Sequence, residues 1–258
     1  NKPFDKFVTE LVTARGKPGT NPAVSWYRAV SDPKDQMADI AQVFLGVRIQ
    51  CAQCHHHPYE KWSQNDYYGF AAFFSTIGRK ELRKMPEDDV VYHKRMLAVS
   101  KNPNTNVDVR PTPLDAAALD VPAHRDPRID LASWMTQPDN PYFARVLVNR
   151  YWKHFFGRGL VEPEDDLRVT NPPTHPELLD GLAESFVKSR FDLKQLCRVI
   201  CNSKTYQRTA YPNEHNGDDD QNFARFYPRR LTAEVMLDAI NDVACLLYTS
   251  DAADEVVR

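Results

Sequence analysis

Long hydrophobic runs are absent from this chain of 258 residues, and no stretch approaches the length that spans a bilayer. The formal net charge is only −2, so the charge balance gives no reason to expect a nucleic-acid partner or an anionic membrane surface. Five cysteines, an odd number, do not make a disulfide framework. A nucleophile elbow, a P-loop and a dinucleotide fingerprint are also missing from the sequence. The sequence offers no nucleophile paired with a base, which disfavours an enzyme.

Glycine is scarce, with 9 glycines against 19 prolines, which indicates helices joined by ordered loops that contain proline. A hydrophobic content of 42% and a charged content of 26% are ordinary for a globular protein. We expect a mainly α fold with two helical subdomains, at residues 1–78 and 126–243. An irregular, proline-rich connector at 79–125 joins them and contains at most a short hairpin, with a β-like piece at Val90-Val91-Tyr92.

Apolar residues recur at helical spacing in several segments, and capping residues mark where the helices begin. The helix that carries an apolar stripe from Asp32-Pro33 is expected to run into Cys51, and Gly157 is expected to end another. The expected helix starts are Asp32-Pro33, Ser63-x-x-Asp66, Asn140-Pro141, Thr174-x-x-Glu177, about Asp192 and about Thr232.

The most informative stretch is Cys51-Ala-Gln-Cys54-His55, which is followed by His56, His57 and Pro58. C-x-x-C-H is the covalent attachment signature of c-type haem. Two cysteines three positions apart lie on one side of a helical turn, so both can form thioethers with one porphyrin. The adjacent histidine is then held against the iron as an axial ligand. The motif predicts haem c bound through Cys51, Cys54 and His55.

A zinc site is the first alternative, with Cys51 and Cys54 as ligands together with His55, His56 or His57. Structural zinc needs four ligands, and this cluster supplies three without a distant partner. The candidates for a second half, Cys197 and Cys201, lie in an apolar pattern and are expected to pack in the core. Such a zinc site would belong to a structural or scaffold module.

A metal-dependent hydrolase is the second alternative, since the loop 157–166 concentrates carboxylates that could act with the histidines at 55–57. The plainer interpretation, which we favour, is a loop between helices whose acids pair with Arg158 and Arg168.

Two blocks of the sequence resemble a known family. The first block comprises Phe44 to Trp62 and Asp66 to Phe74. The second block comprises Asp139 to Trp152, Phe156 to Asp166, Asn171 to Leu179, Ser203 to Gln207 and Arg225 to Glu234. Together they resemble the paired domains of unknown function in large secreted planctomycete-type proteins, which often also carry separate cytochrome c domains.

This resemblance implies an exported, multi-domain bacterial protein in a cytochrome-rich context, without an established enzymatic activity. Its implied location is periplasmic, secreted or at the cell surface, and its implied partners are cytochrome c-type domains or other redox proteins. The family's C-x-x-C-H-x-H-P block falls on Cys51, Cys54, His55, His57 and Pro58. We therefore predict a c-type haem-binding redox or electron-transfer module of a larger protein.

The two ends of the chain are unusual in sequence. The sequence begins Asn1-Lys2-Pro3-Phe4 without an initiator methionine, so we expect a fragment, and the lack of a signal peptide says nothing about location. Residues 244–258 depart from the family pattern and resemble translated read-through sequence, so we expect them to contribute nothing to the function.

Overall fold

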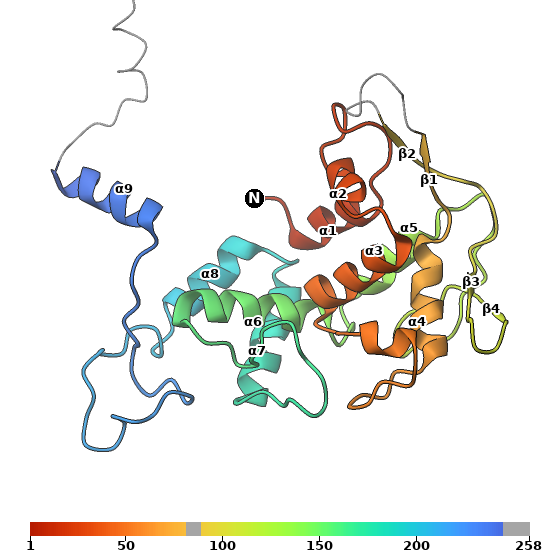
Figure 1. Ribbon diagram of the computed structural model, residues 1–258. Helices are drawn as coiled ribbons and strands as arrows, with labels where there is room; N and C mark the ends of the chain where they lie inside the picture. The colour runs from red at the N-terminus through yellow and green to blue at the C-terminus, as the bar shows by residue number, and fades with distance from the viewer. Residues whose placement is uncertain (81–88, 245–258) are drawn as a thin grey trace, which may run out of the picture.

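The computed structural model describes residues 1–80 and 89–244. Within them the chain forms nine α-helices and two small antiparallel sheets (Figure 1), which confirms the expectation of a mainly helical fold. In the first half the helices are α1 (Phe4–Val12), α2 (Val24–Ala29), α3 (Pro33–Ile40) and α4 (Gln64–Ala71). In the second half they are α5 (Pro127–Met135), α6 (Phe143–Phe156), α7 (Pro176–Lys188), α8 (Leu193–Cys201) and α9 (Ala233–Ala244). None of these described helices is long and apolar enough to cross a bilayer.

Both sheets are two-stranded, and in chain order their strands come between α4 and α5. β1 (Ile77–Lys80) pairs with β2 (Val90–His93), which confirms the strand expected at Val90. β3 (Ser100–Lys101) pairs with β4 (Asp108–Val109), so the described residues hold one sheet more than expected. Strands of two residues are too short to show an alternating pattern, which is why the sequence did not reveal them.

Among the nine described helices, α3, α4, α5 and α8 begin with a side-chain cap. The Asp32 side chain accepts a 2.7 Å hydrogen bond from the backbone of Lys34 at the start of α3. Ser63 and Asp66 form the expected capping box of α4. Gly157 ends α6 in the left-handed region, at φ 82°. These three predictions are confirmed.

The capping box expected at the start of α7 is wrong. The residue that caps this helix is His175, and its side chain makes no capping hydrogen bond. The backbone N–H of Thr174 donates instead to the carbonyl of Leu160, at 2.8 Å, and the Thr174 hydroxyl donates to the same carbonyl at 3.3 Å. The Thr174 hydroxyl, which the sequence pattern predicted to cap the helix, is therefore hydrogen-bonded to a residue of a distant loop.

The buried apolar residues form one continuous cluster that runs from Val8 to Phe223 and includes residues of both halves. In α1, the ring of Phe4 stacks on Phe143 with centroids 5.4 Å apart, and its backbone N–H donates to the carbonyl of Phe191 at 3.0 Å. By contrast, α9 stands apart from the body (Figure 1) and has no buried residue. The division at 1–78, 79–125 and 126–243 stays a prediction, and so does the assignment of the tail 244–258, most of which lies outside the described residues.

A buried arginine holds α5 against the N-terminal helices. Arg128 is 1% exposed, and its Nε and Nη2 atoms donate to the carboxylate of Asp126 at 3.0 and 2.7 Å. Its Nη1 donates to the carbonyl of Ala14 at 3.0 Å, and the guanidinium lies 4.9 Å from the ring centroid of Tyr27. Burial by itself would raise the pKa of Asp126, but the hydrogen bonds and charge of Arg128 outweigh it and hold that pKa below its usual value.

The substitution Asp126→Asn should lower the free energy of unfolding by about 3–5 kcal/mol at neutral pH, because it leaves the Arg128 charge buried without a counter-charge. Because the carboxyl pKa is depressed in the folded state, the stabilisation is complete above about pH 4 and is lost as the pH falls through the folded-state value. Urea denaturation at a series of pH values measures this difference, which should shrink in acid.

The matched control is Asp120→Asn, because Asp120 forms an ion pair with Arg110 in which both side chains are more than half exposed. This substitution should cost less than about 1 kcal/mol. Equal losses in the two variants would contradict a stabilising role for the buried pair.

Candidate functional site

The segment that leads into the cysteine motif ends its helix early. After α3 the chain makes one π-helical turn, η1 (Ala41–Leu45), and leaves the helix at Gly46, whose φ is 66°. The expectation that this helix continues into Cys51 is therefore wrong. The left-handed conformation at Gly46 is accessible to glycine and costly for most other residues. An apolar stripe gives the direction of a helix face, and it does not show where the backbone turns.

The motif itself forms a short 3-10 turn, η2 (Gln50–Gln53), which presents both cysteines to solvent. Cys51 and Cys54 are free thiols and both are exposed, whereas Ala52 between them is fully buried. The carbonyl of Gln53 accepts hydrogen bonds from the hydroxyl of Tyr68 at 3.1 Å and from Gln64 at 3.2 Å. The α4 helix thus anchors the turn from behind and leaves its two sulfurs accessible.

His55 has the hydrogen-bonding state that a metal ligand needs. Its side chain is exposed, and its Nδ1 lies 2.6 Å from the carbonyl oxygen of His56. Because a carbonyl can only accept, Nδ1 carries a proton, and in the neutral ring Nε2 then keeps its lone pair. Metal-binding histidines commonly donate their other N–H to a backbone carbonyl in this way.

His57 is placed differently. It is 7% exposed, and its backbone N–H donates to the carbonyl of Trp62 at 2.9 Å. Its Nδ1 accepts a hydrogen bond from the backbone N–H of Tyr59 at 3.2 Å, so in the neutral ring Nε2 carries the proton. His57 therefore stabilises the turn from 57 to 62. His56, the remaining candidate, is exposed at the surface.

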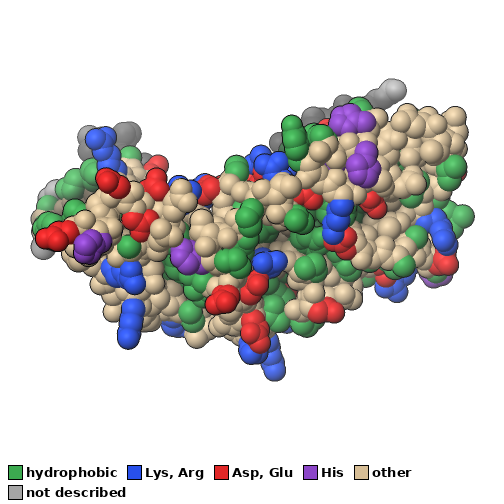
Figure 2. Space-filling model, turned by 90° about the horizontal axis from the view of Figure 1, so that it is seen from below, with side chains coloured by type: hydrophobic (Ala, Val, Ile, Leu, Met, Phe, Trp, Pro, Cys, Tyr) green, Lys and Arg blue, Asp and Glu red, His purple; other side chains and the backbone are tan. Residues whose placement is uncertain are grey.

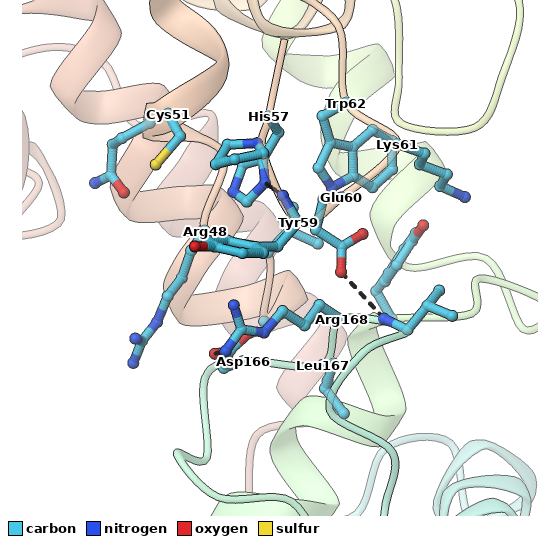
Figure 3. Close-up of a pocket in the computed structure, with 16 residues that line it drawn as sticks. Arg48, Cys51, His57, Tyr59, Glu60, Lys61, Trp62, Asp166, Leu167 and Arg168 are labelled. Atoms are coloured by element: carbon cyan, nitrogen blue, oxygen red, sulfur yellow. Dashed lines mark hydrogen bonds and ion pairs between the residues drawn. The ribbon is translucent and has the colours of Figure 1, made fainter.

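A cavity of about 380 Å³ lies beside Cys51 and joins the motif to a distant loop (Figure 3). Its volume is at the lower end of the range for small-molecule sites. The carboxylate of Glu60 accepts a hydrogen bond from the backbone of Val169 at 3.1 Å, which ties the two walls together. The lining side chains come from the segments 46–51, 57–62 and 166–169 and from Tyr142.

The sequence predicted Arg168 only as a partner of the acidic loop and did not single out Arg48, yet both arginines lie at this cavity. Arg48 and Arg168 line it together with Lys61, and each of the two arginines binds a carboxylate of the acidic loop. The position of Arg48, three residues before Cys51, was the available signal for one of them.

Basic residues bind the acids of the 157–166 loop, as expected for a loop between helices. Most of these residues are not the two arginines that the sequence suggested. Glu162 and Glu164 bind the ammonium of Lys153 at 2.9 and 2.7 Å. The expected pairing with Arg168 is confirmed, because its guanidinium lies 3.1 Å from Asp166. Arg158 forms no ion pair with this loop among the described residues.

The electrostatics of these carboxylates favour their ionised forms. The Lys153 hydrogen bond lowers the pKa of Glu164. Burial would raise the pKa of Asp165, but hydrogen bonds from Gln42 and Arg48 outweigh it and lower that pKa too. A general acid at neutral pH needs the opposite shift.

Charges of both signs are interspersed over the face seen in Figure 2, without a large area of one sign. Within residues 1–80 and 89–244, no three histidine, cysteine or acidic side chains gather closely enough to hold a metal ion. The structure brings His57 and Asp166 to one cavity, and the carboxylate of Asp166 is occupied by Arg168.

Cys197 and Cys201 also differ from expectation. Both lie on α8 and are only partly buried, while Leu196 and Ile200 turn into the core. The apolar pattern of this helix is therefore correct at Leu196 and Ile200, and the cysteines that follow each of them by one position lie beside the buried face.

The substitution Gly46→Ala should lower the free energy of unfolding by about 2–4 kcal/mol, because it adds the left-handed backbone penalty to overpacking. A β-carbon at Gly46 would lie 2.5 Å from Val146 and 2.7 Å from Leu167. Thermal and urea denaturation measure this loss.

Gly181→Ala is the matched control, since Gly181 is an exposed position in α7 where an added β-carbon meets no atom within 4 Å. It should stabilise the protein by about 0.5–1 kcal/mol through helix propensity. Similar effects of the two substitutions would exclude a special packing role for Gly46.

Comparison with known families gives two matches, one for each block of the sequence. Residues 1–79 match PSCyt2, described as a protein of unknown function (DUF1549), so the cysteine motif lies in this segment. Residues 127–256 match PSD1, described as a protein of unknown function (DUF1553). No curated protein and no solved structure matches the chain. The chain therefore belongs to the DUF1553 (PSD1) family and carries a DUF1549 (PSCyt2) segment before it, as the resemblance to paired domains of unknown function predicted.

Proposed function

We propose that this chain is a c-type haem-binding redox module. Cys51 and Cys54 would hold the haem through thioether bonds, and His55 would be a ligand of its iron. The observation that carries the proposal is the arrangement of these three side chains, with two exposed free thiols on one turn and an adjacent imidazole whose Nε2 is open. A haem bound there supplies one-electron redox chemistry.

The surroundings of the turn suit such a group. Tyr59, Trp62 and Tyr142 give the neighbouring cavity aromatic walls, which favour a flat apolar ligand. Arg48 and Arg168 also line this cavity, and each is paired with a carboxylate of the acidic loop, so the aromatic walls are what favours the ligand. The exposure of both cysteines supports electron exchange with an external partner, and a cytochrome c-type domain fits that role.

Haem is favoured over zinc by the number of ligands that each requires. Haem c needs two thiols and one imidazole, and the motif supplies all three. Structural zinc needs four ligands, and the described part of the chain brings no fourth side chain to Cys51 and Cys54. A hydrolase is less favoured, because the carboxylates of the 162–166 loop are paired with Lys153, Arg48 and Arg168.

The location follows from the same chemistry. Thioether attachment of haem c takes place in an oxidising, extracytoplasmic compartment, so we propose a periplasmic, secreted or cell-surface protein. In this setting the exposed thiols of Cys51 and Cys54 would otherwise be open to oxidation.

The full chain, exported in a host with haem c maturation, should give a pyridine haemochrome spectrum whose absorbance stays with the denatured protein. The substitutions Cys51→Ser and Cys54→Ser should each remove one thioether, and the double variant should abolish covalent haem. His55→Ala should change the spectrum of the iron and lower the yield of the holoprotein.

The control is the double variant Cys197→Ser, Cys201→Ser, which changes the same number of thiols at partly buried positions of α8 and should keep the haem. A folded wild-type protein that stays colourless in the maturing host contradicts the haem proposal. Zinc measured at one equivalent per chain in that sample, and lost with Cys51→Ser, would instead identify a structural metal site.

A further inference from the structure

A second cavity lies between the β1–β2 hairpin and the beginning of α5. Its volume is about 320 Å³, and it shares no lining residue with the cavity beside Cys51. Basic side chains dominate its walls, and Asp126 is the one acidic residue among those that line it in the described part of the chain. The lining residues are Arg15, Tyr92, His93, Arg95, His124, Arg125, Asp126 and Ile129.

Backbone hydrogen bonds place the segments that carry three of the basic residues around this cavity. Gly16 pairs with Val91 of β2 through two hydrogen bonds of 2.8 and 3.0 Å, so Arg15 is held beside the strand that carries His93. The strand ends where Lys94 donates to the carbonyl of Thr76 at 2.9 Å. Arg95 follows with a left-handed φ of 53°, which is uncommon for a residue other than glycine.

The carboxylates at this cavity are already neutralised. Asp126 is bound by Arg128 through two side-chain hydrogen bonds. Asp130, which follows the lining residue Ile129 in the chain, is bound by Arg125 through two more. Arg15 and Arg95 are exposed and form no ion pair within residues 1–80 and 89–244. The guanidinium charges of Arg15 and Arg95 are therefore not balanced by a carboxylate at this cavity.

His93 forms part of the wall, and its ring nitrogen does not face a ligand. Its Nε2 is buried and has no hydrogen-bond partner within the described ranges. Because this atom is closed to solvent, an oxygen atom of a ligand in the cavity does not reach it. Burial, together with the charges of Arg95, Arg15 and Arg128, lowers the pKa of His93 against the opposing effect of Asp126.

We propose that this cavity binds a phosphate group, held by the guanidiniums of Arg15 and Arg95. Guanidinium groups match the oxygens of phosphate through paired, charge-assisted hydrogen bonds. Volumes of this size accommodate small-molecule ligands, so the phosphate can be free or can belong to a small ester. This site is independent of the proposed haem, because it uses none of the same residues.

Isothermal titration of the full chain with inorganic phosphate and with glycerol 3-phosphate, at constant ionic strength, tests the proposal. At least one of the two should bind saturably at one site per chain. The double variant Arg15→Gln, Arg95→Gln should weaken that binding about tenfold or more, as expected for the loss of charge-assisted hydrogen bonds.

The matched control is Arg230→Gln, which removes one exposed arginine from a segment remote in sequence from the cavity and should leave binding unchanged. Tighter binding of glycerol 3-phosphate supports a small phosphate ester as the ligand, and equal binding supports free phosphate. The proposal is overturned by the absence of saturable binding of both probes at millimolar concentrations, or by equal weakening in Arg230→Gln. Circular dichroism of each variant verifies that it is folded, and haem content, measured separately, does not enter this result.

Discussion

The close approach of two later segments to Gly46 is the constraint on which the candidate site depends. The backbone N–H of Leu167 donates to the Gly46 carbonyl at 2.9 Å, and there is no room for a β-carbon between Gly46, Val146 and Leu167. This contact brings a loop of the PSD1 segment against the cysteine-bearing turn of the PSCyt2 segment. The cavity beside Cys51 exists because these two segments meet there, and neither would form it alone.

Charge is arranged differently at the two cavities. Beside Cys51, Arg48 and Arg168 are balanced by carboxylates of the acidic loop, so aromatic walls and exposed thiols give that site its character. At the hairpin cavity, Arg15 and Arg95 have no such partners among the described residues. Guanidinium groups that are already paired mainly position a loop, whereas unpaired ones attract an anion. The same residue type would therefore serve an apolar ligand at one proposed site and an anionic ligand at the other.

Sequence reasoning succeeded where the information lies within a few residues. Asp32, Ser63 with Asp66, and Gly157 mark helix ends through hydrogen bonds to their own neighbours, and these predictions are confirmed. It failed at Thr174, whose hydroxyl bonds to the distant Leu160, and at Gly46, where packing against α6 ends a helix that the apolar stripe would continue. The two-residue strands β3 and β4 were missed because they are too short to carry a pattern.

The sequence by itself determined the mainly helical fold, the family and the group that defines the candidate site, because the spacing of Cys51, Cys54 and His55 is a local property of one turn. Only the tertiary structure decided which carboxylates are bound by Lys153, Arg48 and Arg168, and where the two cavities form. These features depend on contacts between residues far apart along the chain. Such contacts arise from the packing of the core as a whole, and the periodicity of a single segment does not predict them.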